Sequence, residues 1–209
     1  MGAMQGGIGW WMVKSGLVNN PDVSHFRLAI HLTTAFLTCA FTLWVALPLI
    51  YRDKREGNKK LLKLTSWLFI LVIIQIIYGA FVAGLNAGKI CNTWPKMCGE
   101  WIPDSIFMIN PFWENFVTNH YGIQFIHRTL AFIIVAFVFY IWNKGRKLQQ
   151  NYLQRKSLNI LLSLVILQTV IGIFTLILVV PISLALIHQL GAFLLLMSVV
   201  FSLFTFSKS

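Results

Sequence analysis

Acidic residues are scarce in this chain: six of its 209 residues are Asp or Glu, and charged residues of both signs make up only 11% of it. An ordinary soluble domain has about a quarter of its residues charged. So few charges, together with 57% hydrophobic residues and a mean hydropathy of +0.74, exclude that class. They indicate an integral membrane protein.

Cysteines are also few. The three are Cys39, Cys91 and Cys98, and no second thiol or histidine pair has the spacing of a zinc site. Cys91 and Cys98 flank a short segment of an outer loop, where an oxidising compartment would permit a disulfide. We expect this pair to be structural or incidental rather than catalytic, and Cys39 to fill space in a helix core.

Long apolar runs are abundant. Runs of about twenty apolar residues, enough to cross a hydrocarbon core at about 1.5 Å per residue, recur between polar breaks. A cleaved signal peptide is not expected, because the first segment lacks a basic start and a suitably placed cleavage site. The pattern predicts an all-α polytopic membrane protein with six transmembrane helices. The expected spans are 2–18, 26–51, 62–85, 121–142, 158–180 and 182–206.

The excess of basic residues is concentrated in two connections between these helices. They are Arg52, Lys54, Arg55, Lys59, Lys60 and Lys63 in the first, and Lys144, Arg146, Lys147, Arg155 and Lys156 in the second. Aromatic residues do not alternate with them, so we expect no nucleic-acid partner and attribute them to the positive-inside rule. Both termini then lie on the cytoplasmic or matrix side. The long connection 86–120 lies outside, where its Trp and Pro residues form either a cap or an aromatic belt.

Three histidines lie inside apolar spans, where an unpaired polar ring is costly. His31, His127 and His188 each follow the start of an inward-running helix, so all three are expected about 10 Å below the outer surface. Hydrogen-bonded core histidines are the alternative reading. Three at one depth on parallel helices favour metal ligation, and in a helical bundle a heme iron. His25 and His120 fall at helix entrances, where we expect a solvated interfacial role.

An internal repeat supports two related sites. Residues 5–9, which precede a helix carrying 28–31, resemble residues 168–172, which precede a helix carrying 184–188. Each pair combines Gln, Ile and Gly on one helix with Leu, Ala, Ile and His on the next. A helix pair used twice indicates two related bundles.

Small and polar residues inside the spans predict close helix contacts. Gly79 and its neighbours Gly84 and Gly88 permit close packing or leave room for a flat ligand. Gln75 and Gln168 are expected to form hydrogen bonds between helices.

Several motifs, in order, resemble those of heme A synthase of the mitochondrial and alphaproteobacterial type. The similarity covers essentially the whole chain. The segments are QGGIGWWMVKSGL (5–17), VSHFRLAIHL (23–32), GAFVAGLNAG (79–88), NTWPKM (92–97), WIP (101–103), QFIHR (124–128) and VPISLALIHQ (180–189). Such enzymes oxidise the C8 methyl group of heme O to the formyl group of heme A during cytochrome c oxidase assembly. The resemblance therefore implies an oxidoreductase of heme A biosynthesis, acting on a CH or CH2 group in a bacterial or mitochondrial inner membrane.

The resemblance also implies two four-helix bundles. Residues 1–60 would form the second half of an N-terminal bundle that handles the substrate heme, and residues 61–209 a complete C-terminal bundle. His127 and His188 would hold a b-type heme between them in the second bundle. His31 matches a metal ligand and catalytic residue of the heme O site in the first.

Polar side chains near these histidines are candidates for cofactor binding. Arg128 and Arg27 are expected near the outer interface, where they would pair with heme propionates or, alternatively, with lipid headgroups. Gln124, one turn before His127, is expected to bond another helix and to face the heme as well. The implied partners are membrane lipid, heme O, heme O synthase, an electron donor such as a ferredoxin, and a second copy of the chain.

The sequence departs from the family pattern at its start. It begins where the third helix of that pattern would begin, so the first two helices, with a Glu-x-x-His-Arg segment, are expected to be missing. We expect either one piece of a split or truncated enzyme, inactive alone, or a decayed copy. A third hypothesis is a bis-histidine b-type cytochrome that only transfers electrons.

Overall fold

The computed structural model describes residues 2–16, 22–51 and 57–208, and this part of the chain contains helices and no strand. Five of the helices are long and apolar enough to cross a membrane, which confirms the expected all-α membrane protein. The helices are α1 (Gly2–Val13), α2 (His25–Ile50), α3 (Lys59–Gly84), α4 (His120–Arg146), α5 (Tyr152–Ile177) and α6 (Ile182–Phe206), with 3-10 turns at Ala87–Lys89, Asp104–Phe107 and Phe112–Phe116.

Helix α1 corrects the expected count of six spanning helices. It has 12 residues, or about 18 Å of length, and it ends at Val13 rather than near residue 18. The backbone N–H groups of Ser15 and Gly16 bond three residues back, to Met12 and Val13, which tightens the last turn and closes the helix. Positions 17 and 18 of the expected span lie outside the described residues.

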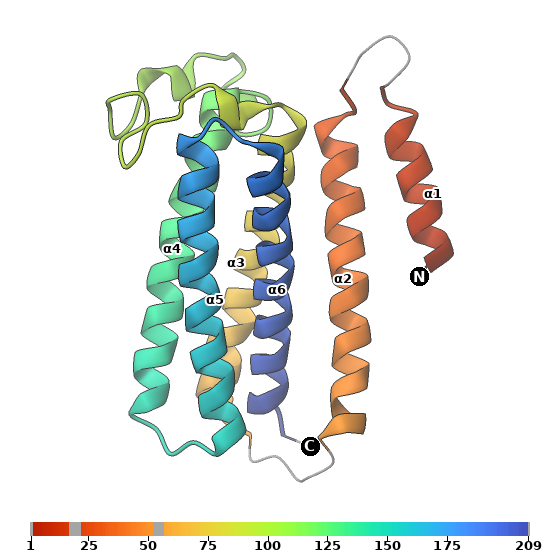
Figure 1. Cartoon of the computed structure of the whole chain (residues 1–209), viewed down its shortest axis with the longest axis vertical. Coiled ribbons are helices and arrows are strands. Elements are labelled where there is room, and N and C mark those ends of the chain that lie inside the picture. Colours follow the sequence, from red (N-terminus) through yellow and green to blue (C-terminus); the bar gives the residue numbers. More distant parts are fainter. Residues whose placement is uncertain (1, 17–21, 52–56, 209) are drawn as a thin grey trace.

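Helices α3 to α6 form a four-membered bundle, and α2 packs beside α3 and α6 (Figure 1). Helix α1 contacts α2 at the edge of the assembly. Successive helices alternate in direction, so α2, α4 and α6 run the same way. The core between them is apolar and fully buried, with side chains that include Leu61, Leu68, Ile141, Leu161 and Leu196.

The long connection (residues 85–119) folds over one end of the bundle (Figure 1). Two buried asparagines hold it. Asn115 donates to the carbonyls of Ile109 and Phe112, while Asn119 donates to Asn115 and to Ser105 and also accepts from the first turn of α4. The long connection is therefore folded against the end of the bundle.

The tryptophans of the long connection point outward. Trp94, Trp101 and Trp113 are 43%, 67% and 61% exposed, so they resemble an interfacial belt rather than the inner side of a cap. Cys39 is also exposed, which contradicts its expected place in a core.

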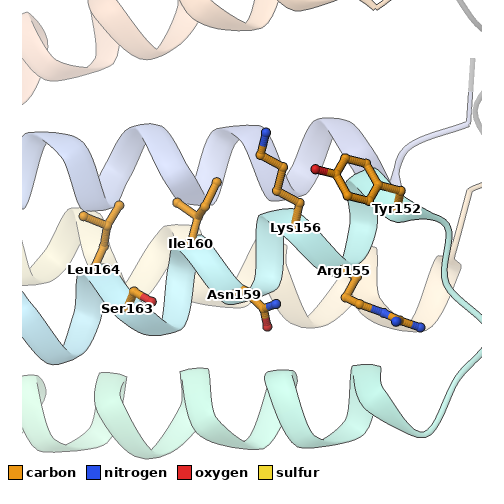
Figure 2. Close-up of a pocket in the computed structure, with 7 residues that line it drawn as sticks. All are labelled: Tyr152, Arg155, Lys156, Asn159, Ile160, Ser163 and Leu164. Carbon is orange, nitrogen blue, oxygen red and sulfur yellow. The ribbon is translucent and has the colours of Figure 1, made fainter.

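The described basic residues of the two predicted basic connections lie at the opposite end of the bundle, where α3 begins, α4 ends and α5 begins. Arg52, Lys54 and Arg55 lie outside the described residues. A shallow hollow of about 530 Å³ occurs at this end of α5; Tyr152, Arg155, Lys156, Asn159, Ile160, Ser163 and Leu164 line it (Figure 2). All of these residues belong to α5 and none is a histidine, so the hollow is separate from any histidine site.

Candidate functional site

Two of the three predicted histidines face each other inside the bundle. His127 lies on α4 and His188 on α6, each within two turns of the end covered by the long connection. Their ring centroids are 6.5 Å apart and the rings are nearly perpendicular, at 77°. The prediction that histidines on different parallel helices share one depth holds for this pair.

Each ring of the pair rests against a glycine on the preceding helix. A Cβ added to Gly79 of α3 would lie 3.2 Å from Cε1 of His127, and one added to Gly172 of α5 would lie 2.8 Å from Cε1 of His188. A real Cβ would be too close in the second case and tight in the first. These glycines therefore make room for the rings beside the helix backbone.

A glutamine one turn before each glycine bonds the same histidine. The side-chain amide of Gln75 donates to the main-chain carbonyl of His127 at 3.0 Å, and that of Gln168 donates to the carbonyl of His188 at 2.9 Å. The same amide nitrogens lie 3.5 Å from Nε2 of the respective rings. The interhelical bonds expected of Gln75 and Gln168 are confirmed.

We call a glycine that makes room for a histidine ring in this way a cradle, and the third predicted histidine has one as well. A Cβ on Gly9 of α1 would lie 3.2 Å from Cε1 of His31 on α2. Gln5 occupies the place of Gln75 and Gln168, one turn before the glycine, although both polar atoms of its buried amide lack a hydrogen-bond partner. The structure therefore contains a Gln-x-x-x-Gly helix followed by a histidine helix three times.

Sequence reasoning found two of these units and missed the third. It matched the α1–α2 pair with the α5–α6 pair but overlooked Gln75, Gly79 and His127, because the long connection separates the two helices. The spacing of four between Gln and Gly, identical in all three helices, is the signal that identifies the missing unit.

Each of the three histidine rings has one nitrogen that forms no hydrogen bond. Nδ1 of His31, His127 and His188 is buried and has no hydrogen-bond partner. In the described part of the chain, no three His, Cys, Asp or Glu side chains converge on one point. The arrangement of His127 and His188 thus offers two imidazoles and no further metal ligand, a donor set suited to the two axial positions of a heme rather than to a tetrahedral ion.

Side chains next to His127 tie α4 to a disulfide loop, residues 91–98, which Cys91 and Cys98 close. Gln124, which is 2% exposed, donates to the carbonyl of Cys91. One guanidinium nitrogen of Arg128 lies within hydrogen-bonding distance of the carbonyls of Thr93, Pro95 and Lys96. Its other terminal nitrogen, Nη1, is buried without a partner. The loop is therefore bonded to α4 at residues that precede and follow His127 in the sequence.

The remaining candidates lie at helix ends. Arg27 donates to the carbonyl of Trp11 and lies over the Trp11 ring, so it joins α2 to α1. His120 is exposed, as expected. His25 is half-buried, its Nε2 bonds to the carbonyl of Val117 and its ring packs on Phe81.

Comparison with known proteins places this chain in a family. The family model described as cytochrome oxidase assembly protein (COX15-CtaA) matches residues 1–200. The chain belongs to this family. The resemblance to heme A synthases that the motifs carry is thereby confirmed.

Relatives named heme A synthase match nearly the whole chain. The protein from Flavobacterium johnsoniae is 47% identical over 212 residues, which cover 100% of this chain and 62% of that protein. The one from Nitrosospira multiformis is 43% identical over 199 residues, which cover 93% of this chain and 56% of that protein. The chain therefore spans about three fifths of the length of these curated relatives.

Proposed function

We propose that this COX15-CtaA family member acts in heme A biosynthesis, as an oxidoreductase that converts the C8 methyl group of heme O into the formyl group of heme A. Its family membership and its relatives named heme A synthase support this proposal. The site that carries it is the pair His127 and His188, for which we propose axial ligation of a b-type heme.

The distance between the two rings is the observation that carries the ligation. An imidazole nitrogen lies about 2 Å from a bound transition metal, and the ring centroid about 1 Å behind it, so two imidazoles on opposite sides of one iron have centroids about 6 Å apart. The centroids of His127 and His188 are 6.5 Å apart. Two unpartnered buried Nδ1 atoms and two glycine cradles also suit rings held ready for a ligand.

A bound heme would supply electron transfer, and the chain supplies its position and surroundings. Gly79 and Gly172 let the rings lie close to the helix backbone. The unpartnered Nη1 of Arg128 is a donor suited to a propionate carboxylate, and Arg27 would serve a second heme in the same way. Gln124 would contribute indirectly, through the disulfide loop that it holds over the site.

His31 belongs in this proposal as a ligand and catalytic residue on the substrate side. Residues 1–60 would form part of the bundle that receives heme O, and residues 61–209 the bundle that holds heme b. The long connection would face the outer side and the C-terminus the cytoplasm or matrix, consistent with the basic residues at the other end. Heme O synthase and a ferredoxin-like donor are the proposed partners.

Replacement of each histidine tests the ligation. The purified full chain should show the spectrum of a six-coordinate, low-spin b-type heme, and His127→Ala and His188→Ala should each abolish that spectrum. His120→Ala, which changes an exposed histidine of the same helix, should leave it intact. Unchanged heme content in both ligand variants would overturn the assignment.

Extraction of hemes from cells that also make heme O tests the reaction. Because the chain spans only about three fifths of the length of its relatives, it is coexpressed with a segment that supplies the rest of a full-length relative; such cells should contain more heme A than cells in which the chain carries His31→Ala. Bound heme b with equal heme A in both would contradict the proposed oxidation and favour a cytochrome that only transfers electrons.

A further inference from the structure

The glutamines Gln75 and Gln168 make the same pair of contacts on two different helix pairs. In each, the amide nitrogen bonds the histidine carbonyl, at 3.0 Å for Gln75 and 2.9 Å for Gln168. In each, that nitrogen is also 3.5 Å from the ring nitrogen Nε2. Each glutamine stands one helical turn before the glycine that cradles the ring.

We propose that Gln75 and Gln168 are positioning residues, which hold His127 and His188 at the height and ring orientation needed for heme ligation. This inference rests on the proposed function, because it assigns a role toward the ligands of that same site. Neither glutamine touches the reacting group in this role; each acts through the histidine that it faces.

The geometry explains how one amide can position a ligand. A carbonyl oxygen within a helix already accepts one backbone N–H and keeps a second lone pair. The glutamine amide on the neighbouring helix donates a hydrogen bond to that second lone pair. Gln75 thereby bonds α3 to α4 at His127, and Gln168 bonds α5 to α6 at His188. Inside a bilayer no water competes for this bond.

The hydrogen bond from the glutamine and the close contact with the glycine resist the same sliding motion between the two helices. Sliding α4 along α3 by one residue, about 1.5 Å, would break the Gln75 bond and move the His127 ring off Gly79. The same holds for Gln168, His188 and Gly172. The amide nitrogen beside Nε2 also contributes a fixed dipole next to the ring, so its loss changes the electrostatic surroundings of the ligand as well as its position.

Methionine in place of each glutamine tests this role, since it keeps the length of the side chain and removes the donor. Gln75→Met and Gln168→Met should retain the histidine ligands but release heme to apomyoglobin about 10-fold to 100-fold faster, the range typical for loss of a residue that supports a metal ligand. Their low-spin electron paramagnetic resonance signals should shift. Gln75→Asn and Gln168→Asn, which keep an amide too short to reach the carbonyl, should behave alike.

Gln154→Met is the matched control. Gln154 is a buried glutamine of α5 whose amide also donates to a carbonyl of α6, that of Thr205, but at the end of the bundle away from the histidines. Its replacement removes the same kind of bond, so it should leave the resonance signals and the rate of heme release unchanged.

Two outcomes would separate the proposals. If the methionine and asparagine variants of Gln75 and Gln168 release heme no faster than Gln154→Met and show unshifted signals, the positioning role is overturned while ligation by His127 and His188 stands. If instead His127→Ala and His188→Ala keep their heme, the proposed ligation itself fails.

Discussion

The ring of His188 lies in the space next to the backbone of Gly172, so that a Cβ there would be 2.8 Å from Cε1 of the ring. Atoms of a packed interior do not approach so closely, and the ring would have to move. The observed position of the His188 ring therefore requires a glycine at position 172. The corresponding distance for Gly79 and His127, 3.2 Å, is less restrictive.

Gly172→Ala is expected to lower heme occupancy strongly, because the added methyl group displaces the His188 ring from its cradle. Gly79→Ala should lower it less. The heme-to-protein ratio of the purified variants measures both. Gly7→Ala adds the same methyl group where no atom lies within 4 Å and should leave occupancy unchanged; equal loss in all three variants would refute the cradle.

Arg128→Met should loosen the disulfide loop. The substitution removes a charged donor shared by three loop carbonyls, which typically contributes about 1.5 to 3 kcal/mol. Hydrogen exchange at residues 93–98 should become faster by the corresponding factor. Arg146→Met, at a guanidinium that lies over Trp142, should not affect this loop, and unchanged exchange in Arg128→Met would contradict the clamp.

Asn119→Ala should destabilise the long connection. The Asn119 side chain caps α4 and bonds Ser105 and Asn115, so its loss leaves buried groups unpaired at a cost of about 2 to 4 kcal/mol. Thermal unfolding in detergent should show a lower transition temperature. Limited proteolysis should cleave the variant sooner within residues 85–119. Asn159→Ala, which removes one exposed bond to Trp142, should cost far less; a similar loss in both would argue against the buried asparagine pair as the anchor.

Alkylation of the unreduced protein tests the disulfide. Cys39 is free and exposed, so one cysteine should react before reduction and all three of the chain afterwards. Cys91→Ser should destabilise the loop by about 2 kcal/mol, the value expected for so short a closed segment. Cys39→Ser serves as the control, and three reactive thiols without reductant would exclude the bond.

Hydropathy predicted the spanning helices well because long apolar runs leave little freedom in a bilayer. It failed for α1, because the apolar residues on both sides of Lys14 did not reveal that the helix ends at Val13, where Ser15 and Gly16 close the last turn. It also failed for Cys39, since an apolar run does not reveal which side of a helix faces other helices and which faces lipid.

The histidines could be chosen from the sequence, but their surroundings could not. An imidazole in an apolar span stands out by its cost. That His127 faces His188, and that Gln75 bonds the His127 carbonyl across 52 positions of sequence, depends on how α3, α4 and α6 pack. Arg128 and Gln124 were expected at a cofactor, and the contacts that the structure adds for them are with the disulfide loop.

Each histidine meets its glycine within a pair of helices that are consecutive in the chain. Two consecutive helices form a helical hairpin and associate within the membrane as preformed segments. Each of the three imidazoles therefore reaches its position against a glycine through a contact inside its own hairpin. Pairing His127 with His188 then needs only the docking of α3–α4 onto α5–α6. A substitution that fills the space beside one glycine would displace one histidine and leave the contacts of the neighbouring hairpin in place.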